Sequence, residues 1–291
     1  MQTASTCPTP TTWRPDMARA NSLQDKVAMV TGGGSGIGQE ICRRLANDGA
    51  RVAVVDRDLD AATSTAQSIG SAAYAVAADV TSEGQVDAAV TAIVERFGRI
   101  DIGVNAAGVG ASAPLVDTTL EQWQRVIDIC LTGVFVTARA QARQMTKQGG
   151  GVIVNIASTN SQQPGEGLSA YCAAKAGVEM LTRVAALELA AQGIRVVGVG
   201  PGLTSTPMVA RFLDNPSASR EFLANIPLGR PAQTADIAAA VAFLASEQAA
   251  YITGQTLYVD GGALMQKYPS LASRKPAVPA TAATAVQEVQ P

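Results

Sequence analysis

A phenol and an ammonium stand four residues apart in the stretch LSAYCAAKAG, residues 168–177. The alanine-rich composition predicts a helix. Residues at positions i and i+4 lie on the same helix face, with Cβ atoms about 5–6 Å apart. Tyr171 and Lys175 therefore present their polar ends to one point in space. The alternative is an ordinary half-exposed amphipathic helix without a functional role. The residues that the rest of the chain places beside this face decide between a functional pair and an ordinary helix.

A glycine-rich turn follows the first apolar run of the chain. The sequence VTGGGSGIGQEI, residues 30–41, has the pattern T-G-x-x-x-G-x-G. Glycines allow a tight turn and let the backbone approach a pyrophosphate, which the N-terminus of the next helix stabilises. Taken alone, the cluster is also compatible with a simple turn. The residues here that we expect to contact a dinucleotide are Thr31, Gly32, Gly34, Ser35, Gly36, Ile37 and Gly38.

An acidic residue ends the second apolar run. Asp56 lies eighteen residues after Gly38, where a carboxylate can bind the ribose hydroxyls of adenosine. A carboxylate repels a 2′-phosphate, and Ser35 supplies no positive charge to attract one. The sequence therefore favours NAD over NADP as the cofactor. The alternative is that Asp56 only caps the next helix and that Arg57 binds a phosphate.

Short apolar runs rich in β-branched residues alternate with helical stretches between residues 23 and 265. The runs lie at 26–33, 51–57, 74–80, 100–108, 151–158, 194–202 and 255–262, and helices are expected at 36–48, 83–97, 119–148, 169–192 and 234–246. Such alternation predicts a doubly wound, Rossmann-type α/β fold, with a parallel sheet covered by helices on both faces. No linker interrupts it, so we expect a single domain.

Two extensions flank this domain. Residues 1–22 are rich in Thr, Pro and Ala, and residues 266–291 are rich in Ala and Pro. We expect both to be disordered or loosely attached. Met17 is an alternative start of the chain, in which case residues 1–16 are not part of the native protein.

The composition excludes several classes of function. The chain of 291 residues has 22 Lys and Arg, 24 Asp and Glu, and no histidine. Without histidine there is no Ser-His-Asp or Cys-His catalysis and none of the usual zinc sites, so we expect no metal. The absence of a basic cluster argues against nucleic acid and membrane surfaces as partners. No apolar run reaches the roughly 18–20 residues of a membrane span.

The cysteines and the N-terminal segment bear on location. The four cysteines form no C-x-x-C pair, which favours a reducing compartment: Cys7, Cys42, Cys130 and Cys172. The N-terminal segment lacks the apolar region of a secretory signal, and it carries an acid and few arginines. We therefore expect a cytoplasmic protein.

The motifs, in their order, resemble the short-chain dehydrogenase/reductase family in its single-domain form. The resemblance covers about residues 24–265 and includes NAAG at 105–108, Tyr171 and Lys175 as Y-x-x-x-K, and Ser158 thirteen residues before the tyrosine. PGLTSTPM at 201–208 and YITGQTLYVDGG at 251–262 are also similar to family segments. Besides the glycine turn, Asp56 and Arg57, the resemblance implies cofactor contacts at Asp79, Val80, Asn105, Ala106, Ala107, Gly108, Tyr171, Lys175, Pro201, Gly202, Thr204 and Thr206.

The resemblance also gives the pair in the first stretch a role beside a nicotinamide. A phenol with an ordinary pKa of about 10 is a poor base at neutral pH, and a nearby ammonium stabilises the phenolate. Tyr171 would be the base in oxidation and the acid in reduction. Ser158 would hold the substrate oxygen, and Lys175 would also contact the ribose. The expected function is hydride transfer between NAD(H) and a small-molecule secondary alcohol or ketone, in a homotetramer.

Two residues depart from the family pattern. Cys130 occupies a position that usually holds an asparagine, which binds a water connecting the lysine to a proton relay. A thiol is a weak donor and acceptor, so we expect this relay to be rewired or weakened. Val197 also replaces a usual asparagine. These departures leave open a low-turnover NAD-binding sensor or assembly protein.

Two segments of the sequence bear on the substrate. The loop after Ser158 offers four polar side chains that could bind a polyol or sugar, or could be solvated: Asn160, Gln162, Gln163 and Glu166. Apolar residues at helical spacing in 207–228 predict a lid over the pocket: Met208, Phe212, Leu213, Phe222, Leu223 and Ile226. An NADPH-dependent ketoreductase of the 3-oxoacyl type remains the alternative enzyme.

Overall fold

Seven parallel strands form one sheet in the computed structural model, which describes residues 23–210, 220 and 222–265. Each strand coincides with a predicted apolar run, because side chains on both faces of a parallel sheet are buried. The strands are β1 (Val27–Thr31), β2 (Arg51–Asp56), β3 (Ala73–Ala77), β4 (Ile102–Asn105), β5 (Gly151–Ile156), β6 (Ile194–Pro201) and β7 (Thr256–Val259). The predicted extensions, 1–22 and 266–291, and two predicted lid residues, Phe212 and Leu213, lie outside the described residues.

The strand order reverses at β1. The sheet runs β3-β2-β1-β4-β5-β6-β7, so β1 pairs with β2 on one side and with β4 on the other. Thr31, which ends β1, is in register with Asn105, which ends β4. In doubly wound sheets, ligands bind beyond the carboxyl ends of the strands at the point where the order reverses. The glycine turn and the NAAG segment both leave the sheet at this edge.

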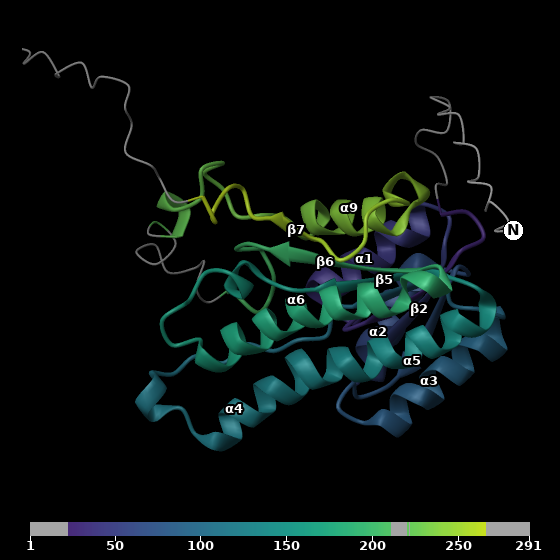
Figure 1. The fold of residues 1–291 in the computed structure, drawn as a ribbon, viewed down its shortest axis with the longest axis horizontal. Coiled ribbons are helices and arrows are strands. Elements are labelled where there is room, and N and C mark those ends of the chain that lie inside the picture. The colour runs from purple at the N-terminus through teal and green to yellow at the C-terminus, as the bar shows by residue number, and fades with distance from the viewer. Residues whose placement is uncertain (1–22, 211–219, 221, 266–291) are drawn as a thin grey trace, which may run out of the picture.

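Helices cover both faces of the sheet (Figure 1). One buried cluster contains side chains of α1, α2 and α9, and the other contains side chains of α3, α5 and α6. The predicted doubly wound α/β fold in a single domain is therefore confirmed. The helices are α1 (Gly36–Asn47), α2 (Leu59–Ile69), α3 (Glu83–Phe97), α4 (Leu120–Ile127), α5 (Gly133–Gln148), α6 (Ser169–Leu189) and α9 (Thr234–Ala245).

The helical segment predicted at 119–148 has an interruption. A π-helical turn, η3 (Asp128–Thr132), separates α4 from α5 and contains Cys130. A π-helical turn accommodates one extra residue in a helix and is frequent at functional sites. The segment predicted at 169–192 ends in a 3₁₀ turn, η5 (Ala190–Gln192). The first of these changes bears on the site, because it sets the direction of the Cys130 side chain.

Candidate active site

The turn after β1 requires glycine at two positions. Gly32 has a φ of +69°, and a Cβ there would lie 2.8 Å from the backbone of Ala107. A Cβ on Gly38 would lie 2.1 Å from the carbonyl oxygen of Gly32. The turn therefore packs directly on the NAAG segment and on the first turn of α1. Gly36 has a φ of +53°, and a Cβ built on it would lie 3.7 Å from the Thr206 side chain. The PGLTST segment therefore also approaches this turn.

The N-terminus of α1 fits an anionic group. Ser35 is the N-cap residue, but its side chain makes no capping hydrogen bond, and the first turn contains no acidic residue. The first N–H groups of a helix have no partner within the helix, and the helix dipole adds positive potential there. Together with the glycine cradle, this end of α1 suits a pyrophosphate. The residues present therefore fit a dinucleotide.

Asp56 lies against the glycine turn. Its Oδ2 accepts a hydrogen bond of 3.0 Å from the N–H of Gly34, and its Oδ1 accepts one of 3.1 Å from the N–H of Asp58. The N-cap of α2 is Asp58, whose side chain accepts from the N–H of Ala61. The alternative in which Asp56 only caps the next helix is therefore wrong. The half-buried carboxylate retains acceptor capacity for ribose hydroxyls.

Other predicted cofactor residues have different environments. The Asp79 carboxylate accepts from the N–H and the hydroxyl of Thr81, and these bonds lower its pKa. Val80 is buried against Gly133. The Asn105 amide is buried and bonded to Gln141 and Asn155. Because that amide is committed to the core, any cofactor contact at position 105 falls to the backbone.

The ends of β5 and the start of α6 carry the three predicted catalytic residues. Lys175 is 4% exposed, and its Nζ donates a hydrogen bond of 2.7 Å to the carbonyl oxygen of Ile156 at the end of β5. The same Nζ lies 5.7 Å from the centroid of the Tyr171 ring. Ser158, also buried, follows β5 by two residues and accepts from the N–H of Asn160 at 3.1 Å. The lysine is thus fixed between the strand end and the tyrosine.

The two departures from the family pattern take part in packing. The Cys130 thiol is buried, accepts from the N–H of Val109 at 3.3 Å and donates to the carbonyl oxygen of Val109 at 3.4 Å. It therefore holds the loop after β4 against η3. Val197 is buried in the core cluster that includes α1 and α9. Among the residues that the structure describes, no hydrogen bond joins Cys130 or Val197 to Tyr171 or Lys175.

Two of the four polar side chains expected in the pocket wall are bonded within the protein. The Asn160 amide donates to the carbonyl oxygen of Gln163 at 3.0 Å. The Gln162 amide donates to Glu179 at 2.7 Å. Gln163 and Glu166 are exposed. Glu179 was not predicted as a site residue, since a single acidic residue in an amphipathic helix gives no sequence signal.

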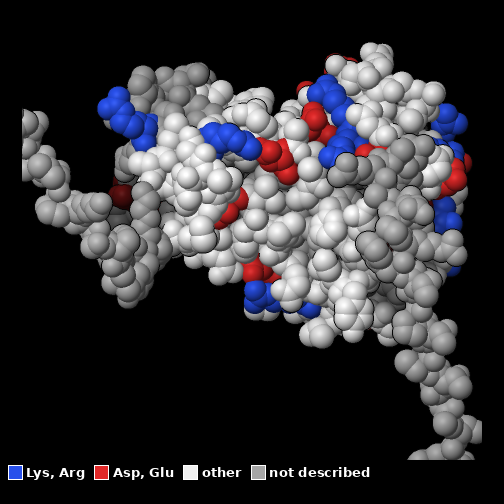
Figure 2. Space-filling model, turned by 90° about the horizontal axis from the view of Figure 1, so that it is seen from above, with Lys and Arg blue, Asp and Glu red and all other residues white. Residues whose placement is uncertain are grey.

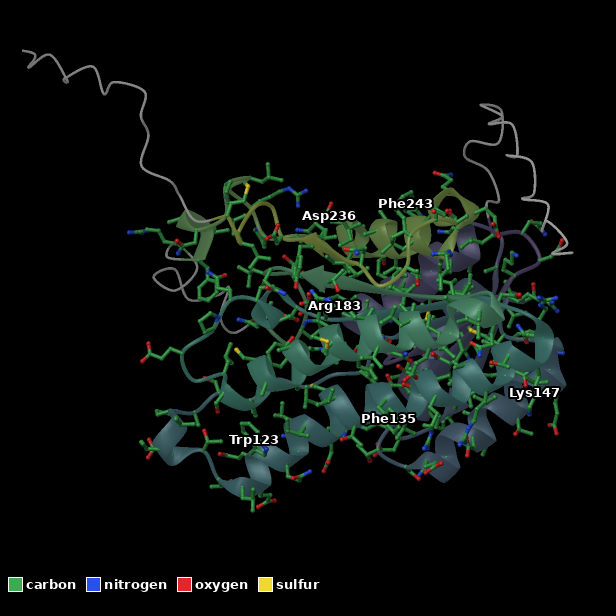
Figure 3. The ribbon with its side chains drawn as sticks, in the orientation of Figure 1. Trp123, Phe135, Lys147, Arg183, Asp236 and Phe243 are labelled. Atoms are coloured by element: carbon green, nitrogen blue, oxygen red, sulfur yellow. The ribbon has the colours of Figure 1, made fainter. Side chains whose placement is uncertain are left out.

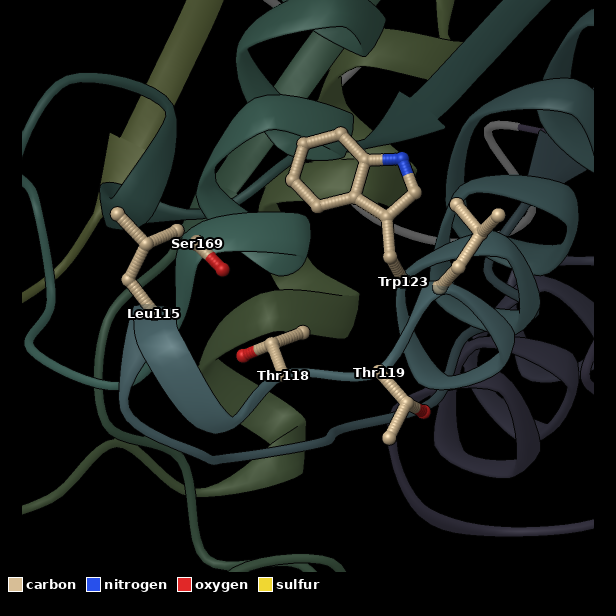
Figure 4. A pocket seen from close by; sticks show the side chains of 6 residues that line it. Leu115, Thr118, Thr119, Trp123 and Ser169 are labelled. Carbon is tan, nitrogen blue, oxygen red and sulfur yellow. The ribbon is translucent and has the colours of Figure 1, made fainter.

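A hollow of about 280 Å³ lies beside the N-terminus of α6 (Figure 4). None of the three predicted catalytic side chains lines it. Ser169 points toward it. Residues two positions apart in a helix differ by about 200° in direction, so Tyr171 projects from another side of α6 than Ser169 does. Its lining residues are Leu115, Thr118, Thr119, Leu120, Trp123 and Ser169.

Comparison with known proteins agrees with this geometry. The chain matches the family model described as enoyl-(acyl carrier protein) reductase over residues 32–263. It is 42% identical over 254 residues to 3beta-hydroxysteroid dehydrogenase 1 of Eggerthella lenta, covering 86% of this chain and 97% of that protein. The chain belongs to the short-chain dehydrogenase/reductase family.

Further relatives of this short-chain dehydrogenase/reductase differ in their substrates. D-threitol dehydrogenase of Mycolicibacterium smegmatis is 40% identical over 82% of this chain and 93% of its own. The crystal structure of 3-ketoacyl-(acyl-carrier-protein) reductase from Brucella melitensis complexed with NADH has a TM-score of 0.79 and 40% identity, over 84% of this chain and 100% of that one. The predicted enzyme class is confirmed: the protein is an oxidoreductase that acts on CH–OH groups by hydride transfer.

Two structural observations concern other predicted properties. Among the described residues, no group of three or more His, Cys, Asp or Glu is placed to hold a metal ion. Within the same part of the chain, no helix has the length and apolar character needed to cross a membrane.

Proposed function

We propose that this enzyme interconverts a secondary alcohol and its ketone, with NAD(H) as cofactor and Tyr171 as the proton-transfer group. The observation that carries the proposal is the buried Lys175, which lies beside the Tyr171 ring and is fixed to the end of β5. A buried ammonium is costly unless it is hydrogen-bonded. Its retention next to a phenol is explained if it stabilises negative charge on the phenol oxygen.

Each residue has a separate task in this reaction. Oxidation removes a hydride from carbon and a proton from the substrate hydroxyl. When bound, the nicotinamide ring supplies the hydride acceptor. The Tyr171 oxygen takes the proton, and Lys175 stabilises the resulting charge. Ser158 holds the substrate oxygen through its hydroxyl and stabilises charge on it. In reduction the same groups act in reverse, with Tyr171 as the acid.

The preference for NAD over NADP rests on Asp56. Its carboxylate accepts a hydrogen bond from the N–H of Gly34 in the glycine turn, which supports a contact with the adenosine ribose. Removing it in Asp56→Ala should reduce the preference for NAD by about tenfold or more, because both charge repulsion toward a 2′-phosphate and the ribose hydrogen bonds are lost. Dissociation constants of NAD and NADP measured by fluorescence titration test this. Wild-type protein that binds NADP as tightly as NAD would contradict the assignment.

The substrate proposal is a small secondary alcohol, with polyols and sugars as the first class to examine. The exposed Gln163 and Glu166 in the loop after Ser158 support a polar substrate. The names of the relatives include a polyol dehydrogenase, a steroid dehydrogenase and a 3-ketoacyl reductase, so a ketoreductase of the 3-oxoacyl type is the second candidate.

The decisive experiment is a panel of polyols, cyclic alcohols, hydroxysteroids and 3-oxoacyl thioesters, each with NAD(H) and NADP(H). The absorbance of the reduced nicotinamide reports turnover. We expect activity with NAD and at least one secondary alcohol. Turnover of 3-oxoacyl thioesters with NADPH alone would favour the ketoreductase, and NAD binding without turnover on any member would favour the sensor.

We also propose a homotetramer in the cytoplasm. Exposed apolar side chains on α5 and α6, and others on α9 and β7, support two separate subunit contacts. Figure 2 views the molecule from the α9 and β7 side and shows Lys, Arg, Asp and Glu side chains in small groups around a broad uncharged area. Cys42, Cys130 and Cys172 are free thiols, which is consistent with a reducing compartment.

A further inference from the structure

A buried carboxylate that takes no part in the proposed proton transfer lies on α6, two turns C-terminal to Tyr171. Glu179 is 5% exposed and occupies the stripe of Tyr171 and Lys175, at successive intervals of four residues. Buried carboxylates are costly unless they are paired and hydrogen-bonded. Three donors from different parts of the chain surround this one, so it requires an explanation that packing alone does not provide.

The three donors join three elements. The Tyr258 hydroxyl on β7 donates to Glu179 Oε2 at 2.6 Å, and the Gln162 amide donates to the same oxygen at 2.7 Å. Arg183, one turn further along α6, forms an ion pair with Oε1; Figure 3 labels Arg183 on this helix. Gln162 directly follows the short helix η4 (Thr159–Ser161), which starts after Ser158. The carboxylate thus links the loop after Ser158 to the catalytic helix and to β7.

A second hydrogen bond also joins the loop after Ser158 to α6. The Ser161 hydroxyl donates to the carbonyl oxygen of Lys175 at 2.9 Å. Two successive residues of the loop, Ser161 and Gln162, are therefore tied to α6, one at Lys175 and one a turn later at Glu179. The segment that begins with Ser158 consequently has its position set relative to the helix that carries the base.

The β7 side of the link is rigid. A Cβ on Gly200 would lie 2.4 Å from the Tyr258 ring, so the ring packs against β6 at a position that only glycine allows. Burial, and then the Glu179 carboxylate, raise the pKa of Tyr258 to about 12. The phenol therefore stays protonated and remains a donor at neutral pH. Hydrogen bonds to an ionised acceptor are roughly twice as strong as neutral ones.

We propose that Glu179 is a positioning residue, which fixes the loop after Ser158 on the catalytic helix so that the Ser158 and Tyr171 hydroxyls meet on one substrate oxygen. The inference rests on the proposed reaction. A misplacement of about 1 Å in such a pair can cost on the order of a hundredfold in rate. Glu179 acts through Gln162, and Arg183 only balances its charge on the solvent side.

The test compares Gln162→Ala with Arg183→Ala. Both remove one partner of the same carboxylate, but only the first removes a bond between the loop and α6, and neither removes a buried charge. We expect Gln162→Ala to lower kcat/KM by about tenfold, with the loss mainly in kcat, and Arg183→Ala to change it by less than about twofold. NAD dissociation constants should be unchanged in both, because the link is remote from the adenosine half of the site.

Two further variants make the result specific to Glu179. Glu179→Gln keeps an acceptor of the same size and should recover most of the activity that Glu179→Ala loses. The double variant Gln162→Ala/Glu179→Ala should be no slower than the slower single variant, since both act through one bond. Wild-type kcat/KM in Gln162→Ala, or losses that add in the double variant, would overturn the proposal.

An observation independent of turnover separates this inference from the proposed reaction. Hydrogen–deuterium exchange in residues 159–167 should be faster in Gln162→Ala than in wild type and unchanged in Arg183→Ala. If wild-type enzyme turns over no alcohol in the panel, the proposed reaction fails, whereas this exchange difference still establishes the loop contact. Unchanged exchange in Gln162→Ala would overturn the contact even in an active enzyme.

Discussion

At the scale of single residues, Tyr171 is the group whose loss should be most specific. Tyr171→Phe keeps the ring, which packs with the cluster around Val126 and Cys130, and removes only the hydroxyl. We expect turnover to fall by about a hundredfold or more, which is the usual contribution of a general acid or base, while NAD binding stays within about twofold. Stopped-flow turnover and NAD titration on the same preparation measure both. A variant that keeps a tenth of the activity would assign the proton to another group.

Cys130 tests whether the departure from the family pattern limits the rate. Its thiol exchanges weak hydrogen bonds with the N–H and carbonyl of Val109, and an asparagine amide has one acceptor and one donor for the same two groups. Gly108 leaves space on this side, because its would-be Cβ lies 3.8 Å from the sulfur. We expect Cys130→Asn to raise kcat by up to about tenfold, or about 1.4 kcal/mol.

The same variant has a stability readout. If the amide is satisfied, the melting temperature should change by less than about 3 °C, which corresponds to roughly 1 kcal/mol for a chain of this size. Cys130→Ser is the matched control, since it replaces the thiol by a smaller, more polar hydroxyl without adding an amide. A slower and less stable Cys130→Asn protein would show that the cysteine is adapted to this apolar cluster.

At the scale of elements, the glycine turn makes a prediction about backbone contact. In Gly38→Ala the new methyl would lie 2.1 Å from the carbonyl oxygen of Gly32, a backbone atom that cannot move alone. We expect loss of NAD binding and a melting temperature lower by several degrees, since overpacking costs about 1–3 kcal/mol. Gly84→Ala in α3 is the control, because nothing lies within 4 Å of its would-be Cβ. It should raise stability by about 0.5 kcal/mol. Calorimetry that finds both variants equally stable would contradict the close approach.

The elements also differ in how well the sequence predicts them. All seven strands were predicted, because buried parallel strands are apolar runs bounded by turn residues. The helical segment 119–148 was predicted without its π-helical turn at Asp128–Thr132, since one extra residue leaves no mark on the hydrophobic pattern. The same limit applies to Cys130: the resemblance to the family singled out its position, but its contact with Val109 depends on the turn.

At the scale of the whole molecule, the sequence singled out the proposed catalytic residues but not the hydrogen-bond network around Glu179. Tyr171 and Lys175 are four residues apart, and Ser158 precedes them at a spacing that a family motif specifies. The bond between Glu179 and Tyr258 joins residues 79 positions apart. Such a contact follows from the pairing of β7 with β6 and the packing of α6 on β6, so no local pattern reveals it.

Two apolar surfaces lie on opposite sides of the molecule. One comprises the α6 stripe of Met180, Val184 and Leu187, at helical spacing, and Phe135 on α5, which packs against α6. The other includes Phe243 on α9 and Leu257 on β7. Figure 3 shows Phe135 and Phe243 on opposite sides. Exposed apolar stripes on helices pack on partner helices. Two separate contacts of this kind would generate a tetramer from two kinds of dimer.

The assembly is tested by charging one surface at a time. Leu187 is 83% exposed, so Leu187→Arg costs the isolated subunit little but places a charge in the α6 contact. We expect light scattering at micromolar concentration to change from tetramer to dimer. Leu59→Arg is the control: Leu59 is 48% exposed at the start of α2, a helix that contributes to neither surface, and the variant should remain tetrameric. A monomeric wild type would contradict the tetramer, and a tetrameric Leu187→Arg would move the contact away from α6.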